Sequence, residues 1–236
     1  QERERGHSID AAIASLAHRD VDGGAVLVNL LDTPGYPDFR GAALSALSAS
    51  DTVAVVVDAV GGIGHGTRRI MEHAARRGLC RAVIINRIDA EGADCGGLLD
   101  ELREAFGNEL LPVNLPASGG RAVVDCFAGG NGDSDLGPVA EWHRRILDQV
   151  VEIDVPVMEH YLDGGEAALG RRELHDAFEQ CLREGHLVPV CFVSARSGTG
   201  LRELLDAIAG LFPHPGEANP PPFRRGTGAD ATPVSA

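Results

Sequence analysis

The chain has 236 residues, 44% of them hydrophobic, and its 35 acidic and 21 basic side chains give a net charge of −14. This length fits one domain or one domain with an insertion, and the acidic balance disfavours nucleic-acid binding by the whole surface, although a local basic face stays open. Apolar runs such as 53–57 are far shorter than the ~20 residues of a membrane helix, and no targeting segment is visible.

The first half of the chain alternates apolar strands with short helices. Ile9, Ala11 and Ile13 alternate as in a half-buried strand, and a turn-rich stretch, 20–24, leads to a buried apolar strand over 25–31. Two strands joined in this way predict a hairpin. The pattern then predicts, in order, helix 41–50, fully apolar strand 52–58, helix 67–77 before Gly78, strand 81–86, and helix 97–106 before Gly107.

This alternation breaks between about 108 and 185. The stretch contains two short strand-like pieces, 110–115 and 121–127, around a Ser-Gly-Gly turn, a Gly/Asn/Asp loop, 129–135, and helices over 138–152, 155–162 and 172–184. A strand over 186–193 and a helix over 200–210 restore the rhythm. We therefore predict an α/β domain made of 1–107 and 186–212, an inserted α+β subdomain over 108–185, and a linker or tail over 213–236.

Four short motifs stand next to the predicted strands. D-T-P-G (32–35), N-R-I-D (86–89) and V-S-A-R (193–196) each follow a strand, and R-G-H-S-I (5–9) precedes the hairpin. Strands of βαβ units run parallel and end at one edge of the sheet, where such sheets bind ligands. Each motif alone is a weak signal, but four in this order and at these places are a strong one.

Together these motifs resemble the GTP-binding domain of translational GTPases, with elongation factor G and the bacterial elongation factor G-like proteins as nearest relatives. Over residues 1–222, Q-E-R-E-R-G-H-S-I resembles switch I, L-L-D-T-P-G-Y-P-D-F switch II, I-N-R-I-D the guanine motif N-K-x-D, and C-F-V-S-A-R-S-G-T-G the S-A region. The resemblance implies a P-loop GTPase-type fold, a mostly parallel sheet with helices on both faces. It also implies a cytoplasmic parent protein that binds GTP or GDP with Mg²⁺, acts on or near the ribosome and uses no membrane.

The resemblance assigns phosphate, metal and catalytic roles near the hairpin. Asp32 would reach Mg²⁺ through water, the Gly35 amide would meet the γ-phosphate, and Ser8 aligns with the switch I threonine that binds Mg²⁺. Tyr36 stands where most translational GTPases carry the switch II histidine, which orients the attacking water.

It also assigns the guanine pocket. Asp89 would accept hydrogen bonds from the guanine N1–H and amine, which adenine does not offer on that edge, and the Ala195 amide would meet O6. Asn86 would tie the base-binding loop together, and Arg87, where the family usually has lysine, would cover the face of the base. Ser194 and Arg196 complete the nucleotide-binding segment.

Ordinary structural roles remain open for these residues. Asp32 and Asp89 can be helix N-caps, Asx-turns or surface acids, Ser8 can be an unremarkable serine, and Tyr36 can pack against the switch without meeting water. For the whole chain, the alternative is a non-catalytic module that senses guanine nucleotides or acts as a scaffold. No nucleophile–base pair or glycine fingerprint supports a doubly wound enzyme of another kind.

The chain departs from the family pattern in what it lacks. All 21 basic residues are arginine, so the loop G-x-x-x-x-G-K-[ST] is absent from the 236 residues, together with its strand and helix. In the family that strand lies between the strands predicted at 25–31 and 52–58. We therefore expect either two apolar strand edges facing a gap or direct pairing of these two strands. We also expect the remaining elongation factor G-like domains to belong to a longer parent, and this chain alone to be inactive.

The cysteines indicate the compartment. There are five, an odd number, without a C-x-x-C pair. This pattern argues for a reducing environment and against a disulfide framework or a zinc site. We expect all five to act as small hydrophobic residues.

Overall fold

The computed structural model describes residues 8–19, 23–217, 223–225 and 232–234. Its strands are β1 (Ala12–Arg19), β2 (Ala25–Asp32), β3 (Thr52–Asp58), β4 (Cys80–Asn86), β5 (Leu110–Pro112), β6 (Asn114–Ala117), β7 (Ala122–Asp125), β8 (Asp133–Ser134), β9 (Gly137–Pro138), β10 (Val188–Phe192), β11 (Phe223–Arg225) and β12 (Thr232–Val234). Its α-helices are α2 (Arg40–Ala46), α3 (His65–Arg76), α4 (Cys95–Phe106), α5 (Val139–Val151), α6 (Val155–Gly164), α7 (Arg171–Glu184) and α8 (Leu201–Leu211).

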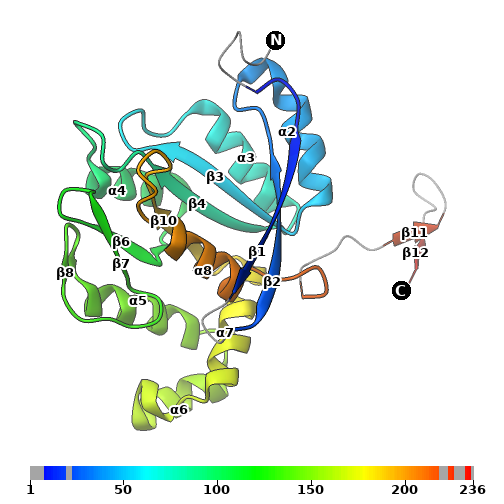
Figure 1. Cartoon of the computed structure of the whole chain (residues 1–236). Helices are drawn as coiled ribbons and strands as arrows, with labels where there is room; N and C mark the ends of the chain where they lie inside the picture. Colours follow the sequence, from blue (N-terminus) through cyan, green and yellow to red (C-terminus); the bar gives the residue numbers. More distant parts are fainter. Residues whose placement is uncertain (1–7, 20–22, 218–222, 226–231, 235–236) are drawn as a thin grey trace.

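A four-stranded parallel sheet in the order β3-β4-β10-β5 forms the centre of the molecule (Figure 1). β3 and β4 pair along their whole lengths, from Thr52 opposite Cys80 to Asp58 opposite Asn86. Helix α3 packs against β3 and β4, and α8 packs against β10. The predicted fold class, a parallel sheet flanked by helices, is therefore confirmed.

The first two strands form a hairpin, as predicted, with Ala12 opposite Asp32 and Arg19 opposite Ala25. They make a sheet of their own: in the part of the chain that the structure describes, β2 pairs with β1, and β3 is one of the two edge strands of the central sheet, with β5 at the other edge. Direct pairing of β2 with β3 is therefore wrong, and both strands keep an open edge. The hairpin instead packs on α8, where His18 Nε2 lies 2.7 Å from Asp206 Oδ1 (Figure 1).

The strands beside these open edges are less buried than their apolar sequences predict. In β2, Val28 is buried, but the side chains of Leu27 and Leu30 are 66% and 41% exposed. In β3, burial alternates, so that Val56 is 61% exposed. The prediction of a buried strand at 25–31 is wrong, because β2 lacks a neighbouring strand on one side, and the apolar strand predicted at 52–58 is buried on one face only.

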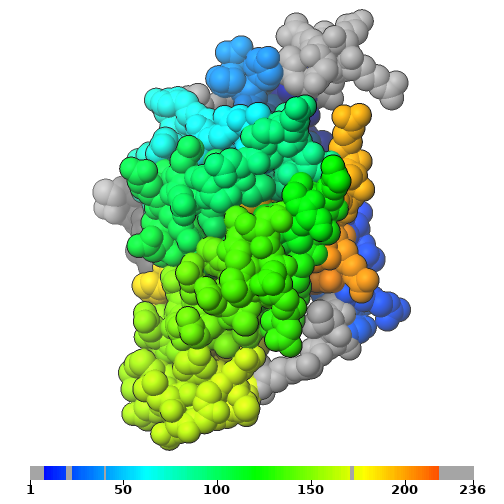
Figure 2. Space-filling model, turned by 90° about the vertical axis from the view of Figure 1, so that its left-hand side faces the viewer, coloured from blue at the N-terminus to red at the C-terminus, as the bar shows by residue number. Residues whose placement is uncertain are grey.

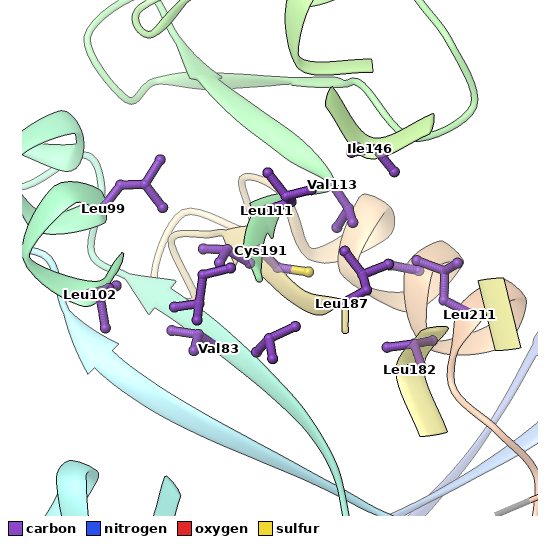
Figure 3. Packing of buried hydrophobic residues seen from close by; sticks show 14 of the residues in the cluster. Val83, Leu99, Leu102, Leu111, Val113, Ile146, Leu182, Leu187, Cys191 and Leu211 are labelled. Carbon is purple, nitrogen blue, oxygen red and sulfur yellow. The ribbon is translucent and has the colours of Figure 1, made fainter. Parts of the chain in front are cut away.

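The hydrophobic core surrounds β10, whose five residues are all buried. Figure 3 shows Cys191 of β10 close to Leu111 of β5 and Val83 of β4, and Leu182 of α7 belongs to the same cluster. Close packing of this kind fixes the direction of a strand. The loop that follows β10 therefore starts from a rigid position.

The predicted strand 110–115 is in fact two strands in different sheets. β5 pairs with β10 in the central sheet, whereas β6 pairs with β7. Between the sheets, the buried Asn114 accepts a hydrogen bond from the Phe192 amide at 2.7 Å and donates one to the Phe192 carbonyl at 3.0 Å. This amide side chain continues the pairing of β10 where the backbone of β6 turns away.

The rest of 108–185 contains the predicted hairpin and helices. β8 and β9 form a second small hairpin, and α5, α6 and α7 follow in order. Figure 2 shows the face on which this segment, coloured green to yellow-green, forms the lower half of the molecule. β5 falls inside the predicted insertion but belongs to the central sheet, and the insertion as a separate subdomain stays a prediction.

The range predicted as a linker or tail contains β11 and β12, which pair antiparallel from Phe223–Val234 to Arg225–Thr232. In Figure 1 they lie apart from the rest of the chain. In the described ranges, no helix has the length and apolar character needed to cross a bilayer.

Candidate functional site

Three parallel strands, β3, β4 and β10, end side by side and bring the predicted motifs to one edge of the sheet. Backbone hydrogen bonds join the three exits: the Ala59 amide donates to the Asn86 carbonyl at 2.9 Å, and the Ile88 amide donates to the Val193 carbonyl at 3.3 Å. The N-R-I-D and V-S-A-R motifs are therefore adjacent loops, as expected from a parallel sheet.

Asn86 is the joint between these two loops. Its Oδ1 accepts hydrogen bonds from the Arg87 amide at 2.8 Å and from the Ala195 amide at 2.9 Å. One side chain thus fixes both the turn after β4 and the turn after β10. The Ala195 amide, which the resemblance assigns to a base oxygen, is occupied by Asn86 in this arrangement.

Arg87 points across the sheet edge to Asp58. Its backbone is left-handed, with φ 64°, and its Nη1 lies 2.6 Å from Asp58 Oδ2. Asp58 Oδ1 accepts hydrogen bonds from the Val60 amide at 2.8 Å and the Gly61 amide at 3.1 Å. The hydrogen bond from Val60 is the largest influence on Asp58 and, with those from Gly61 and Arg87, holds the pKa of Asp58 below its usual value against the effect of burial.

Asp58 is the site residue to which sequence reasoning assigned no role. Its position at the end of an apolar strand was a signal, since three predicted motifs begin with a residue at such a strand end. The structure makes it the partner of Arg87, which the resemblance instead places over a base. In the structure the guanidinium of Arg87 lies against Asp58, whereas the role implied by the resemblance would place it over the base.

Asp89 is exposed at the same edge of the sheet, next to the loop that follows β10. A hydrogen bond from the Ser194 side chain lowers the pKa of Asp89, and the Ser197 hydroxyl and the Arg196 charge act in the same direction. Ser194 itself is fully buried. The carboxylate of Asp89 is therefore ionised at neutral pH. The buried Ser194 side chain holds it on the protein side, and its solvent side is open to hydrogen-bond donors.

The other predicted residues lie on the separate hairpin. Asp32 ends β2 opposite Ala12, and Ser8 stands four positions before Ala12, at the same end of the hairpin. Gly35 is exposed, with no atom within 4 Å of where a Cβ would lie. Tyr36 is 55% exposed, and its carbonyl accepts a hydrogen bond from the Phe39 amide at 3.1 Å.

The predicted site therefore falls into two groups. One edge of the central sheet collects Asn86, Arg87, Asp89 and 194–196, and the end of the hairpin collects Asp32, Gly35 and Tyr36 with Ser8 nearby. Residues 5–7 of the R-G-H-S-I motif lie outside the described residues. Among the described residues, no group of three or more side chains is arranged to hold a metal ion without other ligands.

Comparison with known proteins identifies the family of the chain. The family described as Elongation factor Tu GTP binding domain matches residues 1–214. An elongation factor G-like protein of Mycobacterium tuberculosis (strain ATCC 25618 / H37Rv) is 32% identical over 224 residues, covering 89% of this chain and 30% of the relative. One from Thermotoga maritima is 31% identical over 229 residues, covering 92% of this chain and 32% of the relative.

A solved structure is similar over the same range. A crystal structure of a protein from Thermus thermophilus has a TM-score of 0.77 and 33% sequence identity, over 92% of this chain and 34% of that chain. The chain thus spans about a third of the length of the curated relatives it matches.

Proposed function

We propose that this chain, which belongs to the family of Elongation factor Tu GTP-binding domains, is the guanine-recognition part of an elongation factor G-like translational GTPase. The observation that carries this proposal is the Asn86 side chain, which joins the loop bearing Asp89 to the loop bearing Ala195. This joint supports a pocket with one anionic acceptor and one backbone donor, a pair that matches one edge of guanine.

In this proposal, Asp89 accepts hydrogen bonds from the guanine N1–H and the exocyclic amine. Adenine has no such pair of donors, so its binding would leave the carboxylate without partners. Guanine O6 competes with Asn86 Oδ1 for the Ala195 amide. The Arg87–Asp58 ion pair braces the turn, and the aliphatic part of Arg87 remains available to cover the base.

The hairpin end is proposed to serve the phosphates and Mg²⁺. Asp32 and Ser8 offer oxygen atoms at one end of the hairpin, and Mg²⁺ is usually bound by one or two protein oxygens together with waters and phosphates. When bound, the ion would neutralise charge on the phosphates. Gly35 has no side chain to block a phosphate, and the open space around it suits this role.

Ribosome-coupled GTP hydrolysis in the cytoplasm is proposed for the longer parent protein. The similarity to elongation factor G-like proteins supports it. Tyr36 would then take the position of the water-orienting group. A phenol with a pKa near 10 is a poor proton acceptor at neutral pH, so its contribution would be a hydrogen bond to water rather than proton removal.

A second function, a module that senses guanine nucleotides or acts as a scaffold without hydrolysis, is favoured by Tyr36, a weak proton acceptor at the position where the resemblance places a histidine. GTP turnover by the parent protein, measured with and without ribosomes, separates the two functions. Turnover that ribosomes stimulate supports the GTPase, and absence of turnover in both conditions supports the sensor.

Base specificity tests the guanine proposal itself. We expect Asp89→Asn in the parent protein to weaken GDP binding about tenfold or more, because the asparagine amide replaces one of the two oxygen acceptors that face the guanine donors, and to favour xanthosine diphosphate, whose base accepts where guanine donates. Competition of the three diphosphates of guanosine, xanthosine and adenosine measures this. Glu91→Gln, which neutralises an exposed carboxylate two residues away, is the control and should change nothing. Equal GDP affinity in Asp89→Asn and wild type would remove Asp89 from the pocket.

A further inference from the structure

The hairpin of β6 and β7 lies in the segment between α4 and β10. Its turn packs against the loop that carries Asp89 and does not project into solvent. Its turn contains three successive residues with left-handed backbones, Ser118, Gly119 and Gly120, with φ values of 56°, 68° and 74°. Gly119 is exposed, whereas Gly120 is buried. The turn therefore has an outer and an inner glycine.

The inner glycine lies against the backbone of the N-R-I-D loop. A Cβ placed on Gly120 would lie 2.0 Å from the Ile88 carbonyl oxygen and 3.2 Å from the Asp89 amide nitrogen. Neither atom belongs to a flexible side chain, so the approach is possible because residue 120 has no side chain. The peptide that carries Asp89 thus rests directly on the hairpin.

The same hairpin also touches the loop after β10. Thr199 Oγ1 lies 3.5 Å from the Arg121 carbonyl, at the limit of a hydrogen bond, and 2.9 Å from Ser197 Oγ. In addition, Val123 of β7 packs 3.3 Å from the position of a Cβ on Gly200. One hairpin therefore contacts both loops that Asn86 joins.

The hairpin is fastened to its own segment by Asp135. Asp135 Oδ2 accepts hydrogen bonds from the Gly119 amide at 2.9 Å and the Gly120 amide at 3.1 Å. The Asp135 amide in turn donates to the Pro116 carbonyl at 2.8 Å. Any displacement of the segment around Asp135 is therefore passed to the turn at Gly120.

We propose that the β6–β7 turn is a positioning element for guanine recognition, in which Gly120 sets the place of Asp89 and Arg121 steadies the loop that carries Ala195. The proposal rests on the guanine-binding function above. Gly120 is a positioning residue, since it acts through Asp89.

Two glycine substitutions in this chain test the proposal. Gly119→Ala and Gly120→Ala impose the same left-handed backbone on an alanine, but a Cβ at 119 meets no atom within 4 Å. Amide hydrogen exchange, followed by mass spectrometry, should show about tenfold faster exchange in peptides covering 86–90 and 194–199 for Gly120→Ala than for Gly119→Ala. Exchange in α5, remote from the turn, should be equal in the two variants. Equal exchange at 86–90 in the two variants would overturn the proposal.

A milder variant keeps the test valid should Gly120→Ala unfold the chain. Asp135→Asn adds no bulk and weakens the fastening of the two glycine amides, so it should accelerate exchange at 86–90 in the same direction. In the parent protein, both Asp135→Asn and Gly120→Ala should speed release of a fluorescent GDP about tenfold, and Gly119→Ala should release it like wild type. If the wild-type parent binds no GDP, the guanine function fails, while the exchange experiment still decides whether the turn positions the loop. Unchanged exchange in Asp135→Asn together with unchanged GDP release would also overturn the proposal.

Discussion

At the scale of single residues, the site is held by hydrogen bonds between side chains and backbone amides. Asn86 binds the amides of Arg87 and Ala195, and Asp58 binds those of Val60 and Gly61. Each of these hydrogen bonds holds a backbone amide in one position and so restricts the conformation of the loop to which that amide belongs. The chemistry at Asp89 therefore depends on neighbours that need not contact a ligand themselves.

The buried thiols allow a test of the structure at this scale. Burial raises the pKa of Cys80 to about 11 and that of Cys181 to about 12. Cys95 also reaches about 11, first through burial and then through the charges of Asp135 and Asp94. Because these pKa values in the folded chain lie above the ordinary thiol value, the stabilisation they provide is present below about pH 9 and is lost as pH rises through 11.

We therefore expect the native chain to react very slowly with a thiol reagent at pH 8, and all five cysteines to react in guanidinium chloride, since the thiolate is the reactive form. Ser45→Cys, which places a thiol at an exposed position of α2, is the control and should react at once. The free energy of unfolding should fall between pH 9 and 11. A native thiol that reacts as fast as the one in Ser45→Cys would contradict the packing described here.

Much of the sheet edge that is proposed to bind guanine could be predicted, because strand ends in a parallel sheet meet. Asn86, Asp89 and Ser194 lie where the positions of their motifs placed them. The Arg87–Asp58 pair could not be predicted in this way, since it depends on a left-handed backbone at Arg87, which is uncommon for a residue other than glycine. The contact of Gly120 with Ile88 joins segments far apart in the sequence, and no local pattern records it.

At the scale of elements, the open edges of β2 and β3 are the main departure from expectation. Most helices and strands formed where periodicity indicated, although the predicted strand 110–115 is two strands and β1 begins at Ala12. In β2 and β3, several apolar side chains that the pattern would bury are exposed. The apolar pattern of a strand shows that its side chains can be buried, but it does not show which other strands or helices will pack against them. The hairpin is attached through α8 and the pair of His18 and Asp206 rather than through a shared ladder of hydrogen bonds.

Open apolar edges predict association between copies of this chain. We expect sedimentation velocity to show concentration-dependent dimerisation, and Val56→Lys to weaken it about tenfold, because a charge replaces a side chain that is 61% exposed on the edge strand. Leu162→Lys is the matched control, since this leucine is 75% exposed but lies on α6. A monomer at all concentrations, or equal effects of the two substitutions, would contradict this prediction.

At the scale of the whole molecule, the chain combines a packed central sheet, whose edge we propose binds guanine, with a hairpin that forms a separate sheet. It spans about a third of its curated relatives, and its 236 residues contain no phosphate-binding loop lysine. Charge-assisted hydrogen bonds to phosphate contribute roughly 1.5 to 3 kcal/mol each. Losing three of them costs on the order of 6 kcal/mol, or about 10⁴-fold in affinity. We therefore expect guanine recognition by this chain to be specific but weak.

The most direct measurement is a titration of the isotope-labelled chain 1–236 with GDP and with ADP, followed by amide NMR signals. We expect GDP, with a dissociation constant weaker than micromolar, to shift the amide signals of Arg87, Asp89 and Ala195, because these residues form the proposed pocket. ADP at the same concentrations should leave the three signals in place. Equal shifts with both nucleotides, or none with GDP at about 10 mM, a concentration that suffices for millimolar binding, would contradict the assignment of this edge to guanine.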